Sequence, residues 1–337
     1  MSKIRTNEER ALLRKKLLPI LLVYGAVIVL LIVGQILAPG FLTLNNLNNI
    51  LRTTAFLGIA AIGQTIVILT GGIDLSVQYT LVLCNTVSAQ IMAGSNANIP
   101  QMLLICLGIS VAIGLLNGLG IYYLDIPPMI MTLAVGTMVY GIAYIYCNGA
   151  PKGMTAPFFA TIANGKLGDF FGEGSALHGL GINGTVVIWL LLAAITILVL
   201  SKTVLGRSIY AIGVNRVSAR YSGINVPVTL IGVYVISAVL AGLTGILYVG
   251  YTGTSFLSTG ATYNMDSIAA TVIGGTSVIG GVGGYFGTIA GVLVMTLISN
   301  VLTIMNIAES GKRIVNGLIL VILLVAIYHR KSAKKTK

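Results

Sequence analysis

Charged residues are scarce in this sequence. Only 8% of its 337 residues are charged, whereas soluble domains carry roughly 25%. Acidic residues are the scarcer kind, with eight Asp and Glu against twenty Lys and Arg. Hydrophobic residues make up 56% of the chain, and the mean hydropathy is +0.97. This composition excludes a soluble domain and predicts an all-α integral membrane protein.

Cysteine and histidine are also rare, with three and two copies. Cys84, Cys106 and Cys147 fall in or at the ends of apolar runs without the spacing of metal ligands, so we expect buried free thiols and no metal site. The sequence shows no nucleophile–base pair, no paired carboxylates and no G-x-x-x-x-G-K-[ST] phosphate-binding loop. We therefore expect neither an enzyme nor a cofactor.

The net charge of +12 is concentrated at the two ends and in one loop. Basic residues are frequent in residues 1–16, before the first apolar run, and in residues 329–337, after the last one. The loop 202–226 adds four more: Lys202, Arg207, Arg216 and Arg220. Cytoplasmic segments of membrane proteins carry such an excess. We therefore predict that both tails and this loop are cytoplasmic, that residues 148–184 form an external loop, and that the chain binds no nucleic acid.

Apolar windows of up to roughly 20 residues, the length of a membrane span, define about ten segments. Together they form one transmembrane domain, residues 17–328. The second, third and eighth are short, which indicates broken or re-entrant helices. The segments are 17–38, 52–70, 79–94, 101–124, 129–147, 185–201, 227–251, 266–279, 285–305 and 312–328.

One carboxylate lies inside an apolar stretch. Gly71 and Gly72 allow the helix to break, and Asp74 lies two residues after the pair. An ionised Asp at mid-membrane costs on the order of 2.5–3.5 kcal/mol, so it persists only with partners, water or a task. Its carboxylate can accept N–H groups where the helix restarts, near Ser76. These four residues are candidates for a translocation path or its gate.

Three further polar residues are candidates for the same path. Gln64 and Asn117 lie within apolar helices, and each could line a path or only form hydrogen bonds between helices. Asp266 precedes an apolar run, where a carboxylate would cap the start of a helix.

Two short stretches of the chain resemble each other. Residues 57–61 (LGIAA) precede the glycine pair 71–72, and residues 267–270 (SIAA) precede the glycine pair 274–275. Two halves that each contain a broken helix are typical of transporters. Chance similarity in a chain rich in Gly and Ala is the alternative.

A short helix is predicted within the loop 202–226. Asn215 suits an N-cap, and Gly223 suits the left-handed residue at which a helix ends. Val217 and Tyr221 would share one face, which could dock into a partner's groove or lie at the lipid headgroups. The candidate coupling residues are Asn215, Arg216, Val217, Ser218, Ala219, Arg220, Tyr221 and Gly223.

Taken in order, several motifs resemble the permease subunits of bacterial ATP-binding-cassette (ABC) sugar importers, the ribose, xylose and galactose permease family. The resemblance covers roughly residues 40–328. The motifs are residues 69–77 (LTGGIDLSV), 116–118 (LNG), 126–133 (IPPMIMTL), 210–213 (YAIG), Asn215, 222–224 (SGI) and 274–283 (GGTSVIGGVG).

The resemblance implies a homodimer of about ten-helix subunits in the bacterial inner membrane. It also implies an ATPase subunit that docks on residues 215–223 and hydrolyses ATP, and an extracytoplasmic solute-binding protein. We expect a permease for a small polar solute, such as a monosaccharide or a related polyol or nucleoside. A secondary transporter coupled to protons or sodium through Asp74 is the alternative.

The sequence departs from the family's pattern in three places. Gln78 and Tyr79 stand where family members usually have Gly-Ser, and Arg216 stands where acidic residues usually follow. Asp125 stands at a position that is commonly basic or neutral. From these differences we expect that the substrate and the ATPase partner differ from those of the best-known sugar systems.

Overall fold

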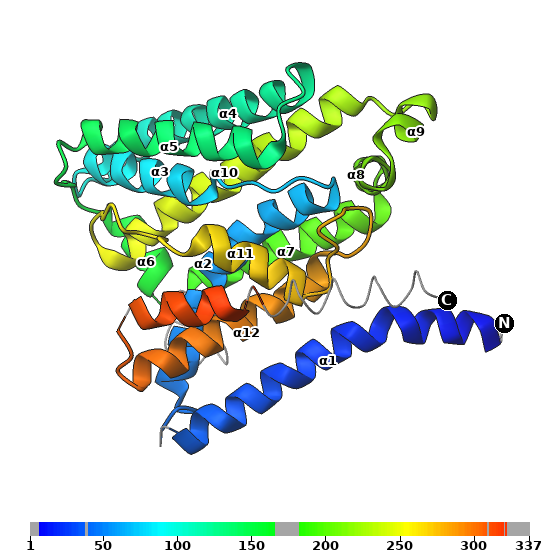
Figure 1. Cartoon of the computed structure of the whole chain (residues 1–337). Coiled ribbons are helices and arrows are strands. Elements are labelled where there is room, and N and C mark those ends of the chain that lie inside the picture. The colour runs from blue at the N-terminus through cyan, green and yellow to red at the C-terminus, as the bar shows by residue number, and fades with distance from the viewer. Residues whose placement is uncertain (1–6, 38–39, 166–181, 309, 320, 322–337) are drawn as a thin grey trace, which may run out of the picture.

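The computed structural model describes residues 7–37, 40–165, 182–308, 310–319 and 321, with side chains from residue 21 onward. Residues 1–6 of the predicted N-terminal tail, the whole predicted C-terminal tail 329–337, and residues 166–181 of the predicted external loop lie outside this range. All regular elements of the described chain are helices (Figure 1). They are α1 (Asn7–Leu37), α2 (Leu44–Leu69), α3 (Val77–Met92), η1 (Asn96–Asn98), α4 (Ile99–Tyr123), α5 (Pro128–Tyr146), α6 (Pro157–Asn164), α7 (Gly184–Lys202), α8 (Val204–Val214), α9 (Arg216–Tyr221), α10 (Val226–Thr252), α11 (Tyr263–Ile273) and α12 (Tyr285–Ile304). Residues 310–319 are also helical.

Six helical stretches of the described chain are long and apolar enough to cross a membrane. They are α2, η1 with α4, α5, α7, α10 and α12. α3 has 16 residues and α11 has 11, which is short of a full span, as the sequence predicts for these two segments. The count of about ten spans is not confirmed.

α2 differs from its predicted form. It has 26 residues and begins at Leu44, so the predicted short segment 52–70 is wrong at its start. The reason is that the polar residues before Leu51 enter the helix instead of ending it. Among them, Asn46 donates a 2.7 Å hydrogen bond from Nδ2 to the Phe41 carbonyl.

α10 lies at the centre of the bundle and packs against α2, α3 and α4. Glycines of α4 bring its backbone against that of α10: a Cβ added to Gly118 would lie 2.7 Å from the Ile231 Cα. Such contacts exclude any larger residue. Close approach at small residues is the usual packing of membrane helices, in which the lipid provides no hydrophobic drive between helices.

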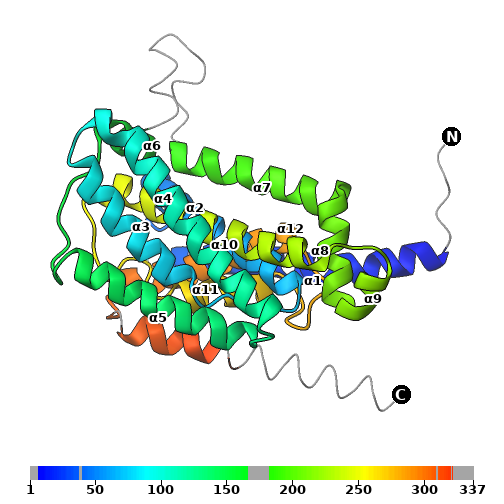
Figure 2. The same ribbon diagram turned by 90° about the horizontal axis from the view of Figure 1, so that it is seen from above.

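The connections between helices gather at two opposite ends of the bundle (Figures 1 and 2). At one end, Gly94 donates a 3.1 Å hydrogen bond from its N–H to the Met154 carbonyl, which joins the α3–α4 connection to the segment before α6. The other end holds the α4–α5 connection, α8, α9 and the α11–α12 connection. The loop 202–226 and the described part of the loop 148–184 thus lie at opposite ends.

The two similar stretches of the sequence pack against each other. Leu57 and Ala61 of α2 share a buried cluster with Ala270 of α11. Each helix is followed by a glycine in the left-handed region, Gly71 with φ +81° and Gly275 with φ +88°. We call residues 70–76 the first break and residues 274–284 the second break.

Candidate functional site

The first break holds a buried carboxylate with three donors. Asp74 is 1% exposed. Its Oδ1 accepts the Ser76 N–H at 2.8 Å and the Ser76 hydroxyl at 2.6 Å, and its Oδ2 accepts the Ser237 hydroxyl of α10 at 2.7 Å. The N–H contact is the one expected where the helix restarts. Hydrogen bonds to an ionised carboxylate are strong, so they offset much of the cost of burying it.

α4 and α5 also hold the first break. Asn117 of α4 donates from Nδ2 to the Ser76 hydroxyl at 2.9 Å, and Thr132 of α5 accepts the Leu75 N–H at 3.0 Å. The Asn117 Oδ1 is buried and has no hydrogen-bond partner among the described residues. The structure therefore brings three candidate path residues, Asp74, Ser76 and Asn117, into one network.

Asn264 of α11 completes the contacts of the first break. Its Oδ1 accepts the Gln78 N–H at 2.8 Å, and its Nδ2 donates to the Leu75 carbonyl at 2.8 Å. Sequence reasoning missed this residue because it placed residue 264 before the start of the helix. The signal that the sequence did offer for this residue was an Asn next to an apolar run.

Asp266 lies in the first turn of α11, near the positive end of the helix as the sequence predicts, but it is not the N-cap residue. α11 begins at Tyr263, with Thr262 as the N-cap residue, so Asp266 falls within the first turn. The helix starts earlier because Asn264 is bonded to the α3 segment and enters the helix. Asp266 Oδ1 instead accepts a 2.8 Å hydrogen bond from Asn316 Nδ2.

Gln64 of α2 is a fully buried amide outside the network. Neither its Oε1 nor its Nε2 has a hydrogen-bond partner within the described chain. Buried amides are almost always paired, so these two atoms call for water or a solute hydroxyl. Gly72 lies against a second buried polar group, the Tyr234 hydroxyl, which also has no hydrogen-bond partner in this part of the chain.

The end of α8 lies against the end of α2 and the second break. Gly281 of the second break donates from its N–H to the carbonyl of Leu69, the last residue of α2, at 2.9 Å. A Cβ added to Gly213 of α8 would lie 2.5 Å from the Gly281 nitrogen and closer still to the Leu69 oxygen. Tyr210 donates to the Gly283 carbonyl at 2.9 Å, and burial raises the pKa of its hydroxyl, which keeps the donor protonated. Sequence reasoning did not assign these contacts.

α9 has the ends that the sequence predicts. The Asn215 Oδ1 accepts the Ser218 N–H at 2.8 Å, and Gly223 has φ +81°. Val217 is 64% exposed and Tyr221 is 87% exposed, so α9 presents apolar surface to its surroundings.

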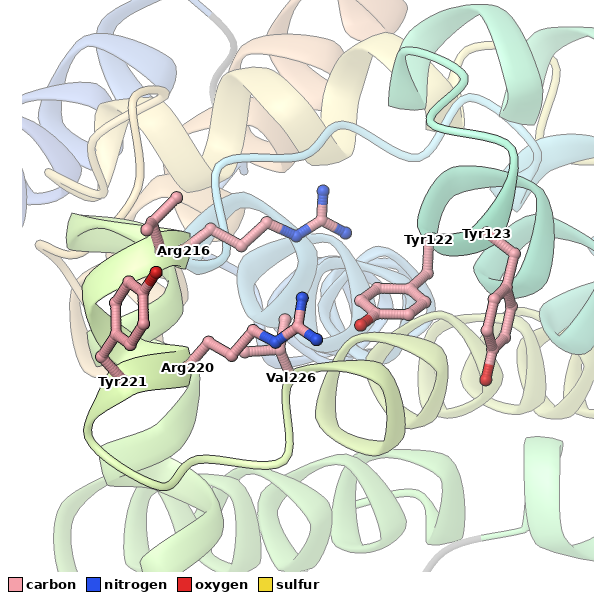
Figure 3. A pocket seen from close by; sticks show the side chains of 7 residues that line it. Tyr122, Tyr123, Arg216, Arg220, Tyr221 and Val226 are labelled. Carbon is pink, nitrogen blue, oxygen red and sulfur yellow. The ribbon is translucent and has the colours of Figure 1, made fainter.

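A cavity of about 650 Å³ opens between α9 and the end of α4 (Figure 3). Ala219 of α9 is buried in a cluster with Ile212 and Val226, and Tyr122 packs against this cluster. The cavity is lined by Tyr122, Tyr123, Arg216, Val217, Arg220, Tyr221 and Val226.

The helical bundle, its buried polar break and its exposed apolar α9 define a multi-pass membrane permease. The chain belongs to the family described as branched-chain amino acid transport system / permease component, whose model matches residues 46–324. No solved structure matches it.

The relatives confirm the resemblance to sugar permeases of ABC importers. Ribose import permease protein RbsC of Escherichia coli (strain K12) is 36% identical over 299 residues, 88% of this chain and 90% of that protein. Galactose/methyl galactoside import permease protein MglC of the same strain is 35% identical over 344 residues, 96% of this chain and 99% of that protein. RbsC of Bacillus subtilis (strain 168) is 34% identical, with 90% and 91% covered.

Proposed function

We propose that this chain is the membrane subunit through which an ABC importer moves a monosaccharide of the ribose or galactose kind into the cell. The observation that carries the proposal is similarity to ribose and galactose permeases along 88–96% of the chain. The family's description refers to branched-chain amino acids. We favour a sugar because these relatives are sugar permeases by name.

Two buried amides support a neutral solute. Gln64 and the Asn117 Oδ1 offer uncharged donors and acceptors without partners among the described residues, and these suit sugar hydroxyls. An amino acid would need a cation and an anion for its charged groups. Both oxygens of Asp74 are already occupied by donors from Ser76 and Ser237.

The proposed assembly contains two copies of the chain, an ATPase subunit, and an extracytoplasmic solute-binding protein, within the lipid bilayer. The basic loop 202–226 faces the cytoplasm, because cytoplasmic segments are rich in Lys and Arg. This loop binds the ATPase subunit through α9. Both termini lie on that side, and the loop 148–184 faces outward. ATP hydrolysis takes place on the separate subunit.

The test is uptake of radiolabelled ribose or galactose into proteoliposomes containing the permease, its ATPase subunit and its binding protein. We expect uptake that requires ATP and is indifferent to proton and sodium gradients. Uptake that follows an ion gradient without ATP would favour the secondary transporter. The occupied oxygens of Asp74 argue against that alternative, because an ion site there would have to displace hydroxyl and N–H donors.

A further inference from the structure

The cavity beside α9 combines two cations with aromatic rings. Arg216 and Arg220 come from α9, and Tyr122 comes from the end of α4. The Arg216 Cζ lies over the Tyr122 ring, 5.4 Å from its centroid. Figure 3 shows both arginine side chains extending from α9 toward Tyr122. A guanidinium held over a ring keeps the N–H groups of its edge available to an anion.

Neither arginine is neutralised within the part of the chain that the structure describes. Neither forms an ion pair there, and the Nη2 of Arg216 is buried without an acceptor. Asp125, on the α4–α5 connection, is exposed and forms no ion pair with them. A buried N–H group without an acceptor is unfavourable, so the cavity favours an incoming anion.

The position of α9 favours a protein over a lipid headgroup as the source of that anion. In Figures 1 and 2, α9 lies farther along the bundle than the ends of α4 and α5. Val217 and Tyr221, both strongly exposed, also line the cavity. A phosphate group would occupy only the cationic part and leave these two side chains in water, whereas a protein surface would cover them.

We infer that the cavity receives an Asp or Glu side chain of the ATPase subunit, whose carboxylate binds between Arg216 and Arg220 beside the Tyr122 ring. Val217 and Tyr221 pack against the surrounding ATPase surface. The inference rests on the proposed function and adds the chemical nature of the partner's side chain.

The test measures the affinity of the ATPase subunit for the purified permease in lipid nanodiscs. The double variant Arg216→Gln, Arg220→Gln should weaken binding by about tenfold or more and reduce its dependence on salt. The matched control Lys202→Gln, Arg207→Gln removes the same charge from exposed positions outside the cavity. It should change the affinity by no more than about twofold.

A charge exchange identifies the partner side chain. A photoreactive amino acid at Tyr221 should crosslink to an ATPase peptide that contains an Asp or Glu. Changing that residue to Lys should abolish binding to the unmodified permease, and Arg220→Glu should restore it. A crosslinked peptide without an acidic residue would contradict the inference.

Val217→Asp separates this inference from the proposed function, because it alters the apolar contact and leaves both arginines in place. Loss of binding in Val217→Asp with full affinity in the arginine double variant would overturn the carboxylate site and retain the coupling role. An unmodified permease that binds no ATPase would overturn the proposed function. An arginine variant that loses bound phosphatidylglycerol but keeps its ATPase affinity would identify a lipid site, and the inference would be wrong.

Discussion

The carbonyl of Leu69 accepts a 2.9 Å hydrogen bond from the N–H of Gly281. This contact joins the end of α2 to the second break, and Gly213 at the end of α8 lies against both partners. The helix that leads into α9 thus touches both elements at one point. A displacement of α9 would reach the end of α2 and the second break through this junction.

The first prediction concerns Gly213→Ala. The added Cβ would overlap the Leu69 oxygen and the Gly281 nitrogen, so the junction must open. Overpacking of this kind typically costs about 1–3 kcal/mol. We expect lower thermal stability in detergent and loss of most ATP-dependent uptake.

Gly232→Ala in α10 is the matched control, because nothing lies within 4 Å of an added Cβ there. It should retain uptake and stability. Normal transport by Gly213→Ala would show that the junction does not need its present geometry.

The second prediction compares two changes at Asp74. Asp74→Asn keeps acceptor oxygen at the first break and should retain folding with partial, ATP-dependent uptake. Asp74→Leu leaves the hydroxyls of Ser76 and Ser237 without their acceptor and should lower stability by about 1–3 kcal/mol. Thermal unfolding and uptake with imposed ion gradients measure both effects. Equal loss in the two variants would contradict the acceptor role.

The sequence predicted the bounds of a helix correctly where the apolar run has clear ends. α5, α10 and α12 begin and end within one residue of the predicted segments, because Pro, Gly or Asn interrupts the apolar pattern there. α11 was predicted less well: it begins three residues before the predicted segment 266–279, because Asn264 enters it through hydrogen bonds to Leu75 and Gln78, and it ends six residues earlier, at Ile273. Local pattern cannot reveal a helix start that depends on a distant hydrogen bond.

In the candidate site too, contacts between residues close in the sequence could be predicted, whereas contacts between distant residues could not. The hydrogen bond from Ser76 to Asp74 spans two residues, and the glycine pair before it predicts such a contact. The hydrogen bond from Ser237 spans 163 residues and depends on the packing of α10. The ends of α9 were predictable from Asn215 and Gly223, whereas the cavity beside it needs Tyr122 from another helix.

The third prediction concerns membrane topology. Ser95 and Ser218 are exposed at opposite ends of the bundle, and the three native cysteines are buried. In a variant without native cysteines, Ser95→Cys should react with a membrane-impermeant maleimide added to intact cells. Ser218→Cys should react only after the membrane is opened, because the excess of Lys and Arg predicts a cytoplasmic loop. The opposite labelling pattern would invert the proposed orientation.

The fourth prediction is that Gln64 contacts the transported sugar. Its amide is fully buried without a hydrogen-bond partner among the described residues. Replacing such a group by an apolar side chain of similar size is nearly neutral or stabilising for folding. Gln64→Met should therefore keep the thermal stability of the permease while the KM for uptake rises or the rate falls, by about tenfold for one or two lost hydrogen bonds.

Asn85 provides the contrasting variant, because its amide is buried and paired. Its Nδ2 donates to the Gly245 carbonyl at 3.1 Å, and its Oδ1 accepts the Phe256 N–H at 3.2 Å. Asn85→Leu breaks both bonds and should lower the unfolding temperature, with uptake falling only as folded protein is lost. If Gln64→Met instead loses stability and transports normally once folded, Gln64 has a structural role and does not contact the sugar.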